Sequence, residues 1–260
     1  MFARRRIPET GPFLATQVHS GDPFEVSHGV PLYCAPTGGS GSGPNALGAS
    51  VLGWDPAVKE AGVDAGYSPE PDMLRAPDVA IGNVPDRPGW IRGVPELAVE
   101  YADIGQDEDK LQQKITDLLD AGTRYLWVVR LAGPRRVEVY RPGEQMSLAQ
   151  PGDRLSAPGV LQNPVLVESL YDRSAAERAT LTNLLQRQGY EDLDAVLREG
   201  KLVHARDALH HLLTRRKIPV STETAARIDA CRDLAQLETW NERAADASPG
   251  TDPSRVFGAD

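Results

Sequence analysis

The stretch PDVAIGNVPDRPGWIRGVPELAVEY at residues 77–101 decides the fold. Its two ends, PDVAIG at 77–82 and PELAVEY at 95–101, are rich in branched and apolar residues, which is typical of buried strands. Proline and glycine recur at short intervals between them and predict a loop. Each predicted strand carries a carboxylate, Asp78 near the start of the first and Glu100 near the end of the second. We therefore expect two neighbouring strands that each contribute one acidic side chain.

The segments that follow predict a crossover connection in a mixed sheet. Residues 107–121 predict a helix, because apolar residues such as Leu111 and Ile115 recur at helical spacing. RYLWVVRL at 124–131 predicts another buried strand, and RRVEVYRP at 135–142 predicts an alternating strand. A strand, a helix and a strand in this order imply that the helix covers one face of the sheet.

The segments before this stretch are less regular. Residues 1–22 are polar and contain proline and glycine, so we expect a loosely held arm. FEVSHGVPLYC at 24–34 predicts a hairpin that turns near His28. GGSGSGPNALG at 38–48 lacks the Lys-Ser/Thr pair of a phosphate-binding loop and is interpreted as a flexible glycine-rich loop.

The character of the chain changes after the predicted sheet. Residues 23–172 form the predicted α/β core, with a mixed β-sheet flanked by helices. Residues 173–247 carry almost no strand signal and predict an all-helical C-terminal subdomain, with helix start signals such as Ser221 after a proline. Residues 248–260 are interpreted as a disordered tail.

Composition limits the classes of protein that this chain can belong to. It has 260 residues, 40% of them hydrophobic and 25% charged, which is an ordinary globular mixture. No apolar run approaches the roughly 20 residues that span a bilayer, and no signal peptide is expected. Cys34 and Cys231 have no partner at metal-ligand spacing, so we expect reduced thiols in a cytoplasmic protein with no membrane contact. The net charge of −9 argues against avid, nonspecific binding to nucleic acid.

Asp78 and Glu100 are the candidates for a metal site. A carboxylate among apolar strand residues is costly to bury unless something compensates its charge. A divalent cation between two such carboxylates is one compensation, and Mg²⁺ prefers one or two carboxylates with water and phosphate in its other positions. The alternative from the residues alone is that Asp78 caps a turn and Glu100 pairs with Arg124 or Arg130.

A cation on the predicted helix could complete the site. On a helix of about 100° per residue, Lys114 lies about 40° from Lys110 and closer to the apolar stripe. Lys114 is therefore the better candidate to reach over the strand ends, and Lys110 points further toward water.

The order of these motifs resembles the Uma2 family of endonucleases, which is similar to the PD-(D/E)XK restriction-endonuclease fold. The resemblance rests on PD-V, then P-x-L-A-V-E, then a helix with K-x-x-x-L-x-x-A-G, then W-V-V and VEVY, and it covers residues 22–172. It implies Mg²⁺- or Mn²⁺-dependent hydrolysis of DNA phosphodiester bonds. It also implies that Asp78 and Glu100 bind the metal and that Lys114 lies near the scissile phosphate.

Several positions depart from the family pattern. The lysine expected two places after the glutamate is replaced by Ala102, and Asp103 either adds a carboxylate or caps the helix. Glu25 stands where family members often carry an acidic residue, which implies an outer ligand. The alternative function is a catalytically inactive nuclease-fold protein that binds nucleic acid or assembles with proteins. A homodimer is a further expectation, because cutting both strands of a duplex usually needs two active sites.

Overall fold

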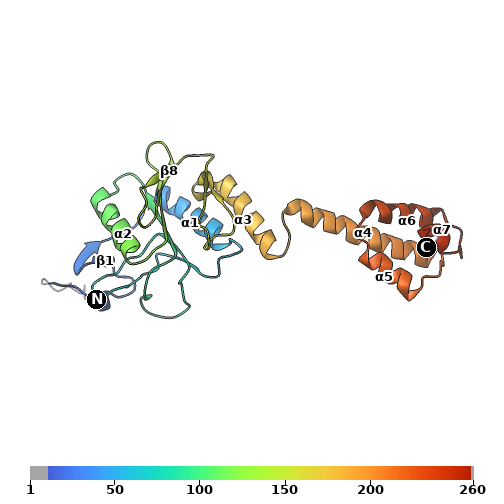
Figure 1. The fold of residues 1–260 in the computed structure, drawn as a ribbon, viewed down its shortest axis with the longest axis horizontal. Coiled ribbons are helices and arrows are strands. Elements are labelled where there is room, and N and C mark those ends of the chain that lie inside the picture. Colours follow the sequence, from blue (N-terminus) through green and yellow to red (C-terminus); the bar gives the residue numbers. More distant parts are fainter. Residues whose placement is uncertain (1–10, 259–260) are drawn as a thin grey trace. The chain divides into compact units, whose positions relative to one another are not determined.

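The structure is a computed structural model that describes residues 11–258 (Figure 1). The described chain forms two compact units that divide between Gln188 and Gly189. Every strand of the described residues belongs to the first unit, and the described part of the second unit is helical. None of the described helices combines the length and the apolar character needed to cross a lipid bilayer. The predicted fold class, a mixed α/β core with helices at its C-terminal side in the sequence, is confirmed.

A six-stranded sheet forms the centre of the first unit. Its strands lie in the order β3 (Ala61–Val63), β4 (Val79–Ile81), β5 (Leu97–Ala102), β6 (Tyr125–Arg130), β7 (Arg136–Tyr140) and β8 (Ser147–Ala149). β5 and β6 are parallel, and the other neighbouring pairs are antiparallel. Helix α2 (Glu108–Asp120) connects the parallel pair, which confirms the predicted crossover.

Local sequence explains where α2 begins and ends. The side chain of Asp107 accepts a hydrogen bond from the backbone N–H of Lys110 at 3.2 Å and caps the first turn. Gly122 follows the last turn with φ +113°, a conformation that glycine adopts without steric cost. The predicted helix therefore has the expected position, and its apolar stripe faces the sheet.

Smaller elements surround the sheet. Strands β1 (Phe24–Ser27) and β2 (Val30–Tyr33) form the predicted antiparallel hairpin, which is confirmed, and β9 (Arg154–Leu155) pairs with β10 (Val165–Leu166). Two short 3-10 helices are η1 (Ala15–Gln17) and η2 (Val167–Leu170). Residues 1–10 of the predicted arm lie outside the described residues. In the described part of the arm, η1 buries Ala15 against Val26 and Leu74, so this part is held on the core.

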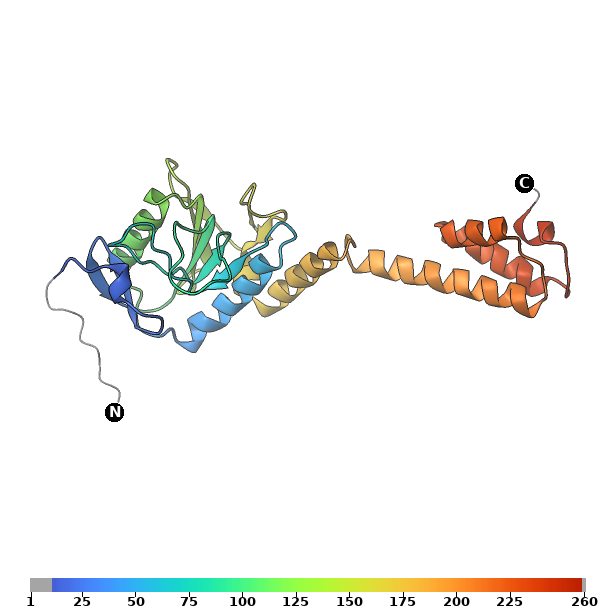
Figure 2. The ribbon, with the colours of Figure 1, turned by 90° about the horizontal axis from the view of Figure 1, so that it is seen from below.

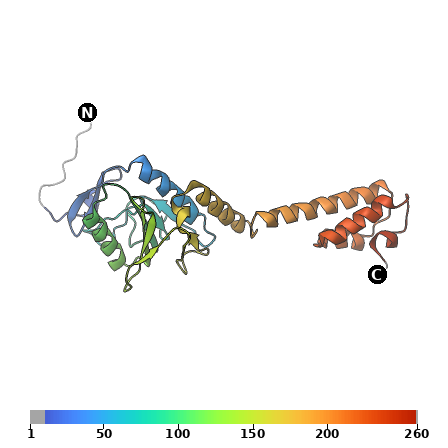
Figure 3. The same ribbon diagram turned by 90° about the horizontal axis from the view of Figure 1, so that it is seen from above.

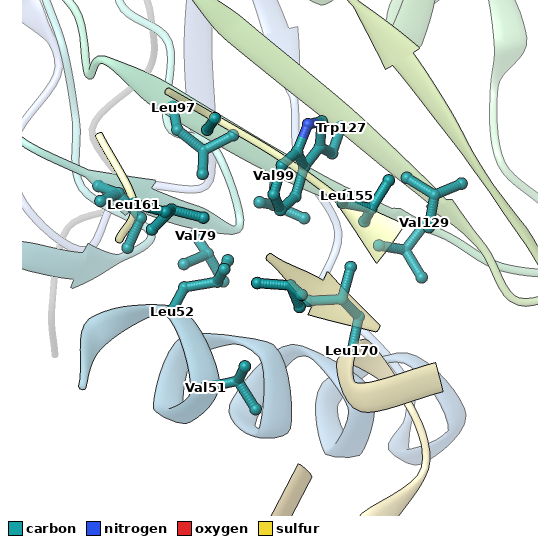
Figure 4. Close-up of a cluster of buried hydrophobic side chains, with 14 of the residues drawn as sticks. Val51, Leu52, Val79, Leu97, Val99, Trp127, Val129, Leu155, Leu161 and Leu170 are labelled. Carbon is teal, nitrogen blue, oxygen red and sulfur yellow. The ribbon is translucent and has the colours of Figure 1, made fainter. Parts of the chain in front are cut away.

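Helices cover both faces of the sheet. Helix α2 lies on one face, while α1 (Gly39–Gly53) and α3 (Arg173–Arg187) lie together on the other (Figures 1 and 2). Figure 4 shows Leu97, Val99 and Trp127 on the face of the sheet toward which Leu52 of α1 points, and Val51 of α1 belongs to the same cluster. These side chains belong to the largest apolar cluster of the described chain and hold the sheet rigidly under α1.

The glycine-rich segment was predicted as a flexible loop, and this prediction is wrong: it forms most of α1. Glycine, serine and an internal Pro44 give the segment low helix propensity, so tertiary packing must stabilise the helix. Gly48 shows why small residues are used, since a Cβ there would lie 1.8 Å from the hydroxyl oxygen of Tyr101. That hydroxyl donates to the carbonyl of Leu170 at 3.0 Å and fixes the close approach.

Helix α3 belongs to the first unit, whereas the predicted boundary lay between residues 172 and 173. The side-chain amide of Asn183 donates to the carbonyl of Val51 at 2.9 Å, and the guanidinium of Arg187 donates to the carbonyl of Trp54 at 3.0 Å. These contacts tie α3 to α1. The helical character of the segment was predicted, but nothing in its own sequence shows which unit it packs on.

The second unit is a small helical bundle. It contains α4 (Leu193–Arg215), α5 (Thr222–Ala230), α6 (Leu234–Asp246) and α7 (Ser254–Phe257) (Figure 3). Ser221 caps α5 by accepting from the N–H of Thr224 at 3.0 Å, as the start signal predicted. Residues 248–258 differ from the predicted disordered tail, because Phe257 is buried and packs edge-on against Trp240 with ring centroids 5.3 Å apart. Residues 259–260 lie outside the described residues.

Candidate active site

The register between β4 and β5 brings the two candidate carboxylates together. Val79 pairs with Val99 and Ala80 pairs with Ala98 across the antiparallel ladder. Continuing the same register by one residue places Asp78 opposite Glu100. Directly opposite residues point to the same face of a sheet. Ala98 packs under α2, and Glu100, two residues further along the strand, shares that face.

Asp78 lies at the edge of β4 and is half-buried. Its Oδ2 accepts a hydrogen bond from the backbone N–H of Tyr101 at 2.6 Å, which turns the carboxylate toward β5. Burial raises the pKa of Asp78, although the ammonium of Lys114 and the Tyr101 N–H act in the opposite direction. Asp78 therefore lies in the charged cluster around Glu100.

Glu100 is the most deeply buried acid of the pair, with 6% of the residue exposed. Burial raises its pKa to about 8, and the neighbouring charge of Asp78 adds to this, while Lys114 opposes it. Its Oε2 accepts a hydrogen bond from Lys114 Nζ at 3.1 Å. Its Oε1 is buried and lies 3.0 Å from the same Nζ, but none of the described residues donates a hydrogen bond to it.

Lys114 connects three acceptors from different elements. Its Nζ lies 3.0 Å from Glu100, 3.1 Å from Glu25 Oε1 and 2.7 Å from the carbonyl oxygen of Ala76. Burial lowers the pKa of Lys114, but the surrounding carboxylates outweigh this and raise it overall, so the amine stays protonated. Lys110 is 51% exposed and pairs with Asp107 at 3.4 Å. The structure thus places Lys114 beside the carboxylates and Lys110 at the surface.

Two charged residues of this cluster were missed in the sequence analysis. Arg75 donates from Nη1 to Glu25 Oε2 at 3.0 Å and from Nε to Asp117 Oδ2 at 2.7 Å. Asp117 had a signal that could have found it, because it lies three residues after Lys114 on the side of α2 that faces the core. Arg75 lies in the irregular segment before β4, and its sequence surroundings carry no comparable signal.

The other candidate partners lie elsewhere. Arg124 pairs with Glu96 at 3.0 Å, and Arg130 pairs with Glu138 at 2.9 Å, so neither neutralises Glu100 as the alternative interpretation allowed. Asp103 does not cap α2.

The carboxylate of Asp103 accepts from Ser40 Oγ at 2.5 Å instead. Ser40 in the first turn of α1 therefore binds the carboxylate just after β5. Asp103 serves this contact between α1 and the sheet, and Asp107 provides the helix cap.

The charges in the cluster suit a divalent cation. Four carboxylates (Glu25, Asp78, Glu100 and Asp117) face two cations (Arg75 and Lys114), which leaves an excess of two negative charges when all are ionised. Glu100 Oε1 is buried and accepts no hydrogen bond from the described residues, although it lies 3.0 Å from Lys114 Nζ, and it is the candidate ligand atom of Glu100. Among the described residues no group of three or more His, Cys, Asp or Glu side chains is arranged to hold a metal. A pair of carboxylates completed by water and phosphate fits Mg²⁺ in particular.

Comparisons with known proteins place the chain in a family. The structure resembles the crystal structure of a "putative nuclease belonging to DUF820" from Anabaena variabilis, with a TM-score of 0.53 and 18% sequence identity. The likeness covers 64% of this chain and 99% of that chain, and it shows a common fold. A comparison with curated proteins gives no match.

The family model described as Uma2, "Putative restriction endonuclease", matches residues 13–166, which is more than half of the chain. The matched range contains β4, β5 and α2, and therefore all of Asp78, Glu100 and Lys114. The resemblance predicted from the sequence motifs is confirmed, and the chain belongs to the Uma2 family.

Proposed function

We propose that the protein is a Mg²⁺-dependent endonuclease that hydrolyses phosphodiester bonds of DNA. The observation that carries the proposal is the convergence of Asp78 and Glu100 on one face of the sheet, with the protonated Lys114 beside them. Membership of the Uma2 family supports the same class of chemistry. Mn²⁺ is expected to replace Mg²⁺, because both prefer carboxylate and water oxygens.

Asp78 and Glu100 would hold the divalent cation. When bound, the cation would polarise the phosphoryl group and lower the pKa of a water molecule. Asp78 is already directed toward β5 by the Tyr101 N–H, so little side-chain freedom would be lost on binding. Glu100 must be ionised to act as a ligand. Its raised pKa means that metal binding releases a proton from some of the molecules at neutral pH.

Lys114 would place its positive charge next to the reacting phosphate. Its position is set by Glu25, Glu100 and the carbonyl of Ala76, which come from three separate segments of the chain. A charge that is held in place before the reaction stabilises developing negative charge without the cost of reorganisation. Two further proposals concern assembly and location. A homodimer would supply two active sites for a duplex, and the free thiols Cys34 and Cys231 fit the cytoplasm.

A second candidate function is supported by one observation. An ammonium has three N–H donors, and in this structure three acceptors surround the ammonium of Lys114. A protein that keeps the nuclease fold but uses Lys114 only to neutralise buried acids would show the same contacts. Such a protein would bind nucleic acid or other proteins without cutting.

A plasmid-nicking assay separates the two functions. The wild type is expected to convert supercoiled DNA to nicked or linear forms with Mg²⁺ or Mn²⁺ and to stop when the metal is chelated. Asp78→Asn and Glu100→Gln keep the size of each side chain and remove its charge, and each is expected to lose nearly all cleavage. Equal cleavage by the wild type and both variants would contradict the proposed active site. Absence of cleavage by the wild type with either metal would favour the binding function.

A further inference from the structure

Arg75 and Asp117 form a second buried ion pair, and Arg75 also contacts Glu25. Neither Arg75 nor Asp117 takes a direct part in the proposed chemistry. The side chains of Arg75 and Asp117 are 2% and 0% exposed. Arg75 donates to Asp117 Oδ2 twice, from Nε at 2.7 Å and from Nη2 at 2.5 Å. Burying a guanidinium costs free energy unless its N–H donors are hydrogen-bonded, and Asp117 accepts two of those hydrogen bonds here.

Asp117 is itself held from several directions. It accepts from Ser27 Oγ at 2.7 Å and from Gln113 Nε2 at 2.7 Å, and His28 Nε2 lies 3.1 Å away. These partners come from the β1–β2 hairpin and from α2, which lie beside each other (Figure 1). The position of Arg75 is therefore fixed by a carboxylate with little freedom of its own.

Arg75 also donates a hydrogen bond to Glu25. Its Nη1 donates to Glu25 Oε2 at 3.0 Å, and the other oxygen of Glu25 lies 3.1 Å from Lys114 Nζ. One carboxylate is thus shared between a fixed cation and the lysine of the candidate site. If Oε2 were released, Glu25 could rotate toward solvent and Lys114 would lose one of its three acceptors.

We propose that Arg75 is a positioning residue. Clamped by Asp117, it fixes Glu25, and Glu25 in turn keeps the ammonium of Lys114 beside Glu100. The inference rests on the proposed function in one respect, since it assumes that the place of Lys114 matters for cleavage. The chain of contacts itself can be measured without any cleavage.

The purely structural alternative is that Arg75 only joins the hairpin to α2. Loss of Arg75 would then lower stability without a selective effect on Lys114. A matched control is Asp55, another buried carboxylate of the same unit. It accepts hydrogen bonds from the backbone N–H groups of Ala57, Gln162 and Asn163, and these three donors lie outside the Arg75 cluster.

The test measures how fast Lys114 reacts with an amine-modifying reagent in the full-length, metal-free protein, by mass spectrometry of its peptide. Lys110, on the same helix and half exposed, is the internal reference. In Arg75→Gln the ratio of Lys114 to Lys110 labelling is expected to rise about tenfold, the effect of losing about one charge-assisted hydrogen bond. Arg75→Lys keeps the charge and is expected to restore part of the wild-type ratio.

The control Asp55→Asn is expected to leave the labelling ratio at the wild-type value. An unchanged ratio of Lys114 to Lys110 labelling in Arg75→Gln would overturn the proposal. So would a ratio that rises equally in Arg75→Gln and Asp55→Asn when both variants lose the same amount of Tm. Should Arg75→Gln fail to fold, Glu25→Gln replaces it, because this variant leaves the Arg75–Asp117 pair in place and is expected to raise the ratio equally. An unchanged ratio in Glu25→Gln would also overturn the proposal. If the variants change the labelling of Lys114 as expected but the wild type never cuts DNA, the proposed function is wrong and the positioning role of Arg75 still holds.

Discussion

The two faces of the six-stranded sheet are stabilised by different kinds of contact. Strand β5 shows this in one segment, because Leu97, Val99 and Tyr101 point to the face under α1, and Ala98 and Glu100 point to the face under α2. The first face is closed mainly by apolar side chains, with hydrogen bonds such as that from Tyr101 to Leu170 but no cluster of buried charges among the described residues (Figure 4). The second also buries charges that must compensate one another. Buried charges often add less to stability than apolar packing of the same volume, which is why the charged face is the one on which we propose the chemistry.

The largest expected effect is a loss of cleavage on the charged face, and it concerns Lys114. Lys114→Met keeps the length of the side chain and removes its charge, and we expect cleavage to fall by about a hundredfold or more, as when one fixed donor to a reacting group is lost. Lys110→Met on the same helix is expected to cut at the wild-type rate. The rates of plasmid nicking for the two variants check this. Equal losses in both would mean that cleavage depends on the positive charge of α2 in general and not on the position of Lys114.

The opposite face is expected to respond in stability and not in chemistry. Leu52 of α1 is fully buried against the sheet, and Leu52→Ala should lower the free energy of unfolding by about 3 kcal/mol, as a large-to-small change in a core does. Cleavage per folded molecule should stay the same when assayed well below the Tm. Denaturant unfolding and nicking of the same sample give both values. If Leu52→Ala lost cleavage without losing stability, the two faces would not have the separate roles described here.

The close approach of α1 to β5 gives a smaller effect on the same face. Gly48→Ala places a methyl group against the hydroxyl of Tyr101, and we expect a loss of about 2 kcal/mol from overpacking. Tyr101→Phe removes the atom that the methyl group meets, so the double variant should recover part of the loss. Unfolding of the single and double variants measures this coupling. Strictly additive losses would mean that α1 tolerates the methyl group by shifting elsewhere.

A further effect is a pH dependence on the charged face. Because burial raises the pKa of Glu100 from 4.5 to about 8, its stabilising contribution is complete below about 4.5 and is lost as the pH rises toward about 8. The metal-free protein should therefore have a lower Tm at the upper end of this range. Glu100→Gln should show a weaker slope, and saturating Mn²⁺ should raise the Tm most at the alkaline end. Identical slopes for the wild type and Glu100→Gln would exclude Glu100 as the titrating group.

The sequence predicted the charged pair better than it predicted its surroundings. Asp78 and Glu100 could be found because each interrupts a short apolar strand, and because antiparallel neighbours pair in a fixed register. Lys114 could be found from helical spacing. Arg75 could not, because it contacts Asp117 42 positions away along the chain, and no local pattern reports such a contact.

The fold shows the same division. Strands β4 to β7, the hairpin and α2 have strong local signals and were predicted, whereas the short strands β3, β8, β9 and β10 were not. Helix α1 was not predicted, because the propensities of glycine and proline oppose a helix, and it is stabilised by packing against the sheet, η2 and α3. The unit to which α3 belongs also depends on contacts such as Asn183 with Val51, which no sequence pattern shows.

Calorimetric titration of Mn²⁺ into the metal-free protein tests the central claim most directly, because it needs no substrate and no turnover. The wild type is expected to bind one ion per chain at the Asp78–Glu100 pair, with release of protons near neutral pH as Glu100 ionises. Asp78→Asn is expected to lose at least about tenfold in affinity. Equal affinity and stoichiometry in the wild type, Asp78→Asn and Glu100→Gln would contradict the claim that these two carboxylates hold a cation.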